Sequence, residues 1–219
     1  MKKSILLAAV LGVLLMVAPV WAATVISPYA GPVTLNVLPD TSYAGTSGAP
    51  WTIFETFSAV AAGDLRFSSE TGSPVGPSNT TQTFHSYGKW IQKTVTNNTG
   101  LTWTSFEIEL QSVYGQPSVD GDGLSFAQGG SLVFTSNQFS AYTRIDTTKD
   151  YLNFSGGDVL QGESVTFWFA ITDNQTNNPF YLRETPNKVD VVGTPEPLTM
   201  LLLGLGLTGL AGLRRRFEK

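Results

Sequence analysis

Apolar and polar residues alternate along much of the chain between positions 33 and 192, which is the pattern of β-strands that bury one face. The alternation and the turn residues between its segments predict strands at residues 33–38, 51–60, 89–96, 101–111, 132–139, 180–183 and 189–192. A nearly continuous apolar run at residues 165–172 predicts one more strand, in the centre of a sheet. No amphipathic helical period of useful length interrupts this pattern, so the sequence predicts an all-β domain.

The clearest local signal is a predicted hairpin in which residues 97–100 (Asn-Asn-Thr-Gly) join the strands at residues 89–96 and 101–111. Asparagine and glycine tolerate positive φ, which a tight connection between strands needs. The second strand has an apolar face, expected to point into the core, that carries Phe106, Ile108 and Leu110. Its other face, expected to meet water, carries Trp103, Ser105, Glu107 and Glu109.

Turn residues also divide the rest of the domain. Residues 68–83 are rich in Ser, Thr, Gly and Pro and predict a long surface loop, and Gly156-Gly157 predicts a turn. Many short strands with such punctuation are typical of an antiparallel β-sandwich, either jelly-roll-like or immunoglobulin-like. The immunoglobulin cysteine–tryptophan signature is missing because the chain has no cysteine, so the choice of topology stays open.

The N-terminal segment has the three parts of a secretory signal. Lys2 and Lys3 are basic, residues 5–17 are apolar, and residues 20–22 (Val-Trp-Ala) have small residues at the outer positions. This order predicts a signal-peptide helix at residues 1–22, with signal peptidase cutting after Ala22.

The C-terminal segment, residues 195–219, predicts a membrane anchor. Residues 198–213 are apolar and would form a transmembrane helix of about 24 Å, slightly short for a hydrocarbon core of about 30 Å. The basic tail at residues 214–219 should stay in the cytoplasm, which puts the domain on the other side of the membrane. Before the helix, Pro195 and Pro197 hold Glu196 on an extended chain that a protease or transpeptidase can bind.

This tail resembles the PEP-CTERM sorting signal of Gram-negative bacteria. The resemblance is carried by Pro195-Glu196-Pro197, the apolar helix, and the basic stop cluster Arg214, Arg215 and Arg216. It implies that an exosortase-like membrane transpeptidase processes an inner-membrane-anchored precursor. It also implies delivery to the cell surface or extracellular matrix, and an association with exopolysaccharide and biofilm. Residues 97–100 with Trp103 and Phe106 are similar to a strand-turn-strand pattern in some proteins of this group.

The domain between the two ends, residues 23–194, is acidic. It carries 7 basic and 15 acidic side chains, because the other six basic residues lie in the targeting segments. Such a domain is not expected to bind nucleic acid. With no cysteine, a single histidine (His85) and no G-x-S-x-G motif, the chain offers no evident nucleophilic centre, so no catalytic residue is assigned.

Three groups of residues remain as candidates. Glu107 and Glu109 would suit a glycoside hydrolase but fit ordinary solvent-facing residues better. Asp120 and Asp122, in an Asp-Gly-Asp-Gly segment, would suit either a tight turn or a site for a Ca²⁺ cofactor. Trp51, Trp90 and Trp103 would suit either sugar stacking or packing.

The sequence therefore favours an exported, non-enzymatic surface or matrix protein with a structural or adhesive role. The first alternative is a carbohydrate-binding module, with or without calcium, that acts on exopolysaccharide. The second is a glycan-active hydrolase.

Overall fold

The computed structural model of the chain describes residues 24–69, 85, 87–119, 121–127, 132–145, 149–174 and 178–187. The predicted signal segment, the predicted strand at residues 189–192 and the whole predicted sorting tail lie outside these residues, so they stay predictions. Within the part described, no helix combines the length and the apolar composition needed to cross a membrane.

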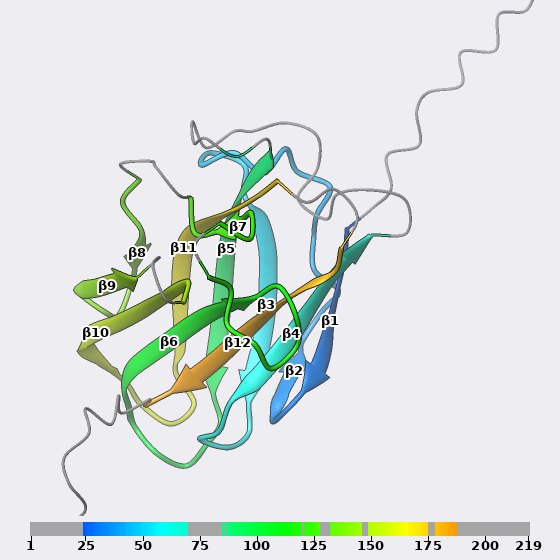
Figure 1. Cartoon of the computed structure of the whole chain (residues 1–219). Helices are drawn as coiled ribbons and strands as arrows, with labels where there is room; N and C mark the ends of the chain where they lie inside the picture. The colour runs from blue at the N-terminus through cyan, green and yellow to red at the C-terminus, as the bar shows by residue number, and fades with distance from the viewer. Residues whose placement is uncertain are drawn as a thin grey trace, which may run out of the picture. The chain divides into compact units, whose positions relative to one another are not determined.

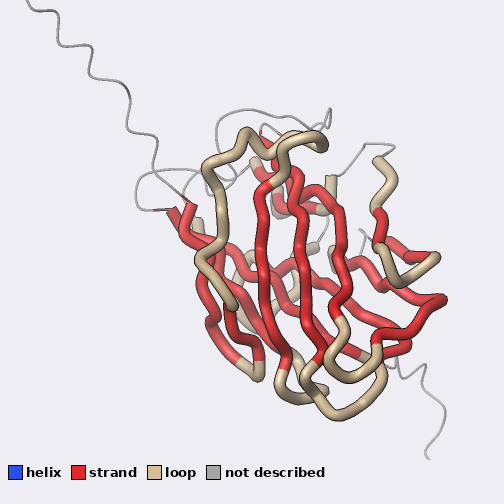
Figure 2. The backbone as a smooth tube through the Cα atoms, turned by 180° about the vertical axis from the view of Figure 1, so that it is seen from behind, coloured by secondary structure: helices blue, strands red, loops and turns tan. Residues whose placement is uncertain are grey.

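The described residues form strands in two layers that pack face to face (Figure 1). Sheet A has the order β1 (Thr24–Ala30), β4 (Gly63–Ser69), β12 (Phe180–Pro186), β6 (Trp103–Gln111), β10 (Tyr151–Val159) and β9 (Ala141–Ile145). Sheet B has the order β2 (Val33–Leu35), β3 (Trp51–Phe57), β5 (Tyr87–Asn97), β11 (Ser164–Asp173) and β7 (Leu124–Ser125), and β8 (Thr135–Ser136) also pairs with β11. Figure 2 shows sheet B from behind, with its long strands side by side. The prediction of an all-β sandwich is confirmed.

One strand pair departs from the predicted antiparallel arrangement. β3 and β5 run parallel, with Ile53 opposite Lys93, whereas the other strand pairs among the described residues are antiparallel. Parallel neighbours need a crossover connection. Here the chain leaves β3, contributes β4 to sheet A, and returns to sheet B as β5.

The predicted hairpin around residues 97–100 is wrong in its pairing. β5 and β6 both exist, but β5 pairs with β3 and β11 in sheet B, and β6 pairs with β10 and β12 in sheet A. The turn therefore forms a corner between the two sheets. A local turn signal reports that the chain changes direction, but it does not report which strands then pair.

The predicted turn at Gly156-Gly157 is also wrong, because both glycines lie inside β10. The pairing of β10 with β6 shifts register between Ser155 and Val159, which marks a bulge. Gly156 has a φ of +79°, and a Cβ on Gly157 would lie 2.0 Å from the carbonyl oxygen of Gln138. Glycine is needed here for a close approach of backbone to backbone within a strand.

The core between the sheets is rich in aromatic rings. Phe106, Ile108 and Leu110 are buried as predicted, and β11 lies inside sheet B as predicted. Trp103 was expected to face water, but it is fully buried against Phe57 and Phe106, with ring centroids 6.0 Å and 5.4 Å away. The bulge in β10 lies beside this end of β6, so simple alternation does not hold at Trp103.

Three charged side chains also lie in this core. Lys93 of β5 places its Nζ 2.5 Å from Oε2 of Glu55 on β3 and 2.5 Å from Oε1 of Glu184 on β12. All three side chains are completely buried. Each occupies an inward position of its strand, so Glu55 and Lys93 reach across from sheet B to Glu184 of sheet A. We call these residues the buried triad.

Candidate ligand-binding face

The loop after β6 folds back over the outer face of sheet A, across β12 and β4 (Figure 1). A hydrogen bond from Gly115 N to Oε1 of Gln111, at 2.8 Å, ties the loop to the end of β6. Gly115 has a φ of +79°, which suits glycine at this turn. The loop thereby brings Tyr114 onto a face otherwise built only from strands.

Three tyrosine rings meet at this position. Tyr29 of β1 and Tyr181 of β12 lie on either side of β4, and their ring centroids are 4.7 Å and 5.4 Å from that of Tyr114. The centroids of Tyr29 and Tyr181 are 4.9 Å apart. Tyr29 remains 48% exposed and Tyr114 40% exposed, while Tyr181 is half-buried. This tyrosine patch presents aromatic surface to solvent on a polar sheet face.

A fixed ion pair borders the patch. The guanidinium of Arg183 binds Asp64 through two contacts, Nε to Oδ1 at 2.8 Å and a terminal nitrogen to Oδ2 at 3.3 Å. The same guanidinium lies 5.8 Å from the ring centroid of Tyr114. The hydrogen bond to Asp64 raises the pKa of Arg183 above its usual value. Two-point binding of this kind sets the direction of the remaining donors as well as the charge.

The cross-strand neighbours of Tyr181 and Arg183 are also polar. Arg66 and Gln111 lie opposite Tyr181 on the two adjacent strands, and Glu109 lies opposite Arg183. The residues of this face come from β1, β4, β12, β6 and the loop, so only the assembled sheet brings them together. Alternation within the strand at residues 180–183 puts Tyr181 and Arg183 on one face, and this signal in the sequence could have pointed to the site.

Glu107 and Glu109 share the outer face of β6, as predicted, but they do not face water. They are 1% and 5% exposed, respectively. β6 is flanked on both sides, and the large side chains of Tyr151 and Arg183 stand directly opposite Glu109. Oε1 of Glu109 accepts a hydrogen bond from Gln111 at 2.7 Å, and Oε2 of Glu107 lies 4.0 Å from Nζ of Lys149. Both glutamates are therefore held by neighbouring side chains within this face.

Asp122 closes a turn between β6 and β7. Its carboxylate accepts hydrogen bonds from Leu124 N at 3.0 Å, from Val119 N at 3.3 Å and from the Ser118 hydroxyl at 2.9 Å. This geometry supports the interpretation of the segment as a turn. Asp120 lies outside the described residues, so the calcium site with Asp120 and Asp122 stays a prediction. The described residues contain no group of three acidic or histidine side chains placed to hold a metal ion.

The tryptophans considered for sugar stacking have other surroundings. Trp51 and Trp103 are buried, so their rings are not open to a sugar. Trp51 donates its indole N–H to the carbonyl oxygen of Tyr43 at 3.0 Å. Trp90 is half-buried and packs edge-on against Phe134, with ring centroids 6.1 Å apart. Trp90 and Trp103 belong to different sheets.

His85 is buried, and its Nδ1 lies 2.9 Å from the hydroxyl of Thr172. The same hydroxyl donates to the carbonyl oxygen of Ser125 at 3.2 Å. These contacts link the β11 end of sheet B to β7 and give His85 a packing role.

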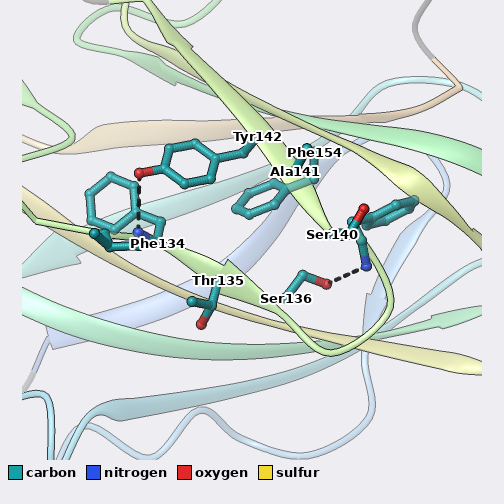
Figure 3. Close-up of a pocket in the computed structure, with 9 residues that line it drawn as sticks. Phe134, Thr135, Ser136, Ser140, Ala141, Tyr142 and Phe154 are labelled. Atoms are coloured by element: carbon teal, nitrogen blue, oxygen red, sulfur yellow. Dashed lines mark hydrogen bonds between the residues drawn. The ribbon is translucent and has the colours of Figure 1, made fainter.

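A hollow lies beside β8, β9 and β10 (Figure 3). It has a volume of about 410 Å³, and Phe134, Tyr142 and Phe154 form much of its wall. The Tyr142 hydroxyl accepts a hydrogen bond from Phe134 N at 3.3 Å. Among the described residues that line it, none is acidic or basic, so the hollow offers aromatic surface and hydroxyl groups and no acid–base pair.

No family model matches this sequence, and comparisons with curated proteins and with solved structures likewise give no match.

Proposed function

We propose that this chain is an exported, non-catalytic surface or extracellular-matrix protein whose β-sandwich adheres by binding polysaccharide on the outer face of sheet A. The observation that supports this is the tyrosine patch, in which the exposed rings of Tyr29 and Tyr114 and the half-buried ring of Tyr181 stand beside the fixed Arg183–Asp64 pair.

The chemistry of the patch suits a sugar ring. Aromatic faces carry negative charge, and the C–H bonds on one side of a sugar ring are weakly positive, so the two surfaces attract. The hydroxyl groups at the sugar's edge then need donors and acceptors. Arg183 and Arg66 supply donors at the border of the patch, and the tyrosine hydroxyl groups supply both donors and acceptors. A rigid sheet holds these groups at constant spacing, which suits a polymer with a repeating unit.

The route to the surface belongs to the same proposal. Residues 1–22 act as the signal-peptide helix, and residues 198–213 act as a transmembrane helix that holds the precursor in the inner membrane. An exosortase-like enzyme then recognises Pro195, Glu196 and Pro197. The resemblance of the tail to the PEP-CTERM signal supports this route.

Retention of the protein on isolated exopolysaccharide tests the binding proposal. Changing Tyr29 or Tyr114 to Ala should weaken binding by about 2- to 12-fold, because one aromatic contact contributes about 0.5–1.5 kcal/mol beyond its buried area. Tyr43→Ala is the matched control, since Tyr43 is an exposed tyrosine outside the patch. Equal retention of the Tyr29, Tyr114 and Tyr43 variants would refute the assignment of the site.

A further inference from the structure

The buried triad brings an amine and two carboxyl groups together where water does not reach. Nζ of Lys93 is 2.5 Å from one oxygen of Glu55 and 2.5 Å from one oxygen of Glu184. Lys93 and Glu55 come from neighbouring strands of sheet B, and Glu184 comes from sheet A. The contact therefore spans the core.

The surroundings of the triad are apolar. Lys93 lies opposite Ile53 and Phe167 on the adjacent strands, and Glu184 lies opposite Ile108. Among the described residues, none outside the triad is hydrogen-bonded to the Lys93 ammonium or to the carboxylate oxygens of Glu55 and Glu184. Buried charges without further hydrogen bonds are costly, so an ion triad is a poor final state for these groups.

We propose that Lys93 and Glu184 form an intramolecular amide bond that joins sheet B to sheet A, with Glu55 as the catalytic residue that takes a proton from the amine. The reacting groups already lie at contact distance, and the folded sheets hold them there. Such positioning replaces a bimolecular encounter with an intramolecular step.

The two carboxyl groups have different roles. Burial, followed by the charge of Glu55, raises the pKa of Glu184 well above its usual value, which favours the neutral acid. A neutral carboxylic acid can accept an amine at its carbonyl carbon, whereas a carboxylate resists attack. Glu55 then serves as the base beside the amine.

The reaction balances in atoms and charge. The Lys93 ammonium gives one proton to the Glu55 carboxylate and becomes a neutral amine. Its Nζ attacks Cδ of the protonated Glu184 and forms the C–N bond. The C–OH bond of Glu184 then breaks, and the hydroxyl leaves as water with a second proton from Nζ, relayed through Glu55. The products are one amide, one water molecule and a protonated Glu55, all uncharged.

The product removes the electrostatic cost of the starting state. Before the reaction, the core holds an ammonium and a carboxylate, and afterwards it holds an amide and a neutral acid. Loss of the water to solvent, out of an apolar core, opposes the reverse reaction. The bond is independent of polysaccharide binding, because the triad lies inside the sandwich and the tyrosine patch lies on its outer face.

Mass spectrometry of the purified full chain tests this proposal. The N- and C-terminal residues of the purified protein define a calculated mass. The measured intact mass should be lower than this calculated mass by one water molecule. Trypsin should fail to cut after Lys93, and a branched peptide should join residues 184–188 to the peptide that contains Lys93. An intact mass without the loss of one water molecule would overturn the assignment. A branched peptide in which Lys93 is joined to Glu55 in place of Glu184 would also overturn it.

Two variants make the test specific. Lys93→Arg should abolish the mass loss, and Glu55→Gln should abolish or strongly slow it, since the base is gone while the reacting pair remains. Lys89→Arg is the matched control, because Lys89 is buried on the same face of β5 but donates to the carbonyl oxygen of Ala44 at 2.8 Å. Circular dichroism establishes whether each variant folds. If either triad variant fails to fold, the wild-type mass and peptide map decide the question alone.

Discussion

Single side chains stabilise the turns of this fold through hydrogen bonds, and Asp122 is an example. Its two carboxylate oxygens satisfy backbone N–H groups on both sides of a turn and also bind the buried Ser118 hydroxyl. Short polar side chains are favoured in turns because they can take the place of a backbone partner. The sequence suggested the turn, but the identity of the groups that Asp122 would bind depended on the path of the chain.

Asp122→Ala should lower the free energy of unfolding by about 1–3 kcal/mol, because it leaves N–H groups without their charged acceptor. Urea denaturation measures this loss. Asp158→Ala, at an exposed position of β10, is the control and should change stability by less than about 0.5 kcal/mol. If bound calcium were responsible for the stability of the turn, a chelator would produce the same loss in the wild-type protein.

At the scale of elements, the corner between β5 and β6 decides how the sheets are connected. Asn97 is fully buried there, and its side-chain amide donates to the carbonyl oxygens of Leu101 at 2.7 Å and Val159 at 2.9 Å. Its side-chain oxygen accepts a hydrogen bond from Thr99 N at 3.0 Å. Trp103 adds an indole N–H bond to the Thr99 hydroxyl at 3.1 Å. Residues 97–100, which were predicted to form a hairpin turn, thus form a corner between the two sheets.

Asn97→Ala should destabilise the protein by about 2–4 kcal/mol, because it leaves buried carbonyl groups at the corner without their donor. Asn98→Ala is a close control, since Asn98 is exposed and its side-chain oxygen accepts a hydrogen bond from the exposed Gln161 at 2.8 Å. Thermal unfolding of the two variants compares them directly. Similar melting temperatures would show that the corner contributes little.

At the scale of the whole molecule, the proposed function gives the sandwich and the tail separate tasks. In that proposal, the sandwich binds polysaccharide through the tyrosine patch, and the tail directs the chain to the cell surface. The apolar run at residues 198–213 is slightly short, and its entry is rigid, which suits a temporary anchor that is recognised and cut.

The C-terminus of surface-localised protein should therefore lie before Arg214, and mass spectrometry of its last peptide measures this. Loss of the basic tail is expected because processing separates the domain from its membrane helix. Changing both Gly204 and Thr208, which share one face of the predicted helix, to Leu should impair the cut while membrane insertion survives. Recovery of an intact end at residues 214–219 on the cell surface would show that the tail is a permanent anchor.

The fold class could be predicted because alternation is a local property that survives without knowledge of partners. The inward face of β6 at Phe106 and Ile108 followed from it, and the interior position of β11 followed from its nearly continuous apolar run. The pairing of β5 and β6 could not be predicted, because a turn signal is compatible with a hairpin and with a corner. The prediction that the glutamates of β6 face water was wrong. Solvent exposure depends on neighbouring strands, which are distant in sequence.

By itself, the sequence determined that this chain builds strands, that their apolar faces form one core, and that its two ends have the composition of targeting segments. These properties depend on the order of residues along the chain. Only the tertiary structure decided that Glu55, Lys93 and Glu184 meet, and that Tyr29, Tyr114 and Tyr181 form one patch. Each of these groups draws on segments separated by tens of residues, and the register of the assembled sheets sets the distances between them.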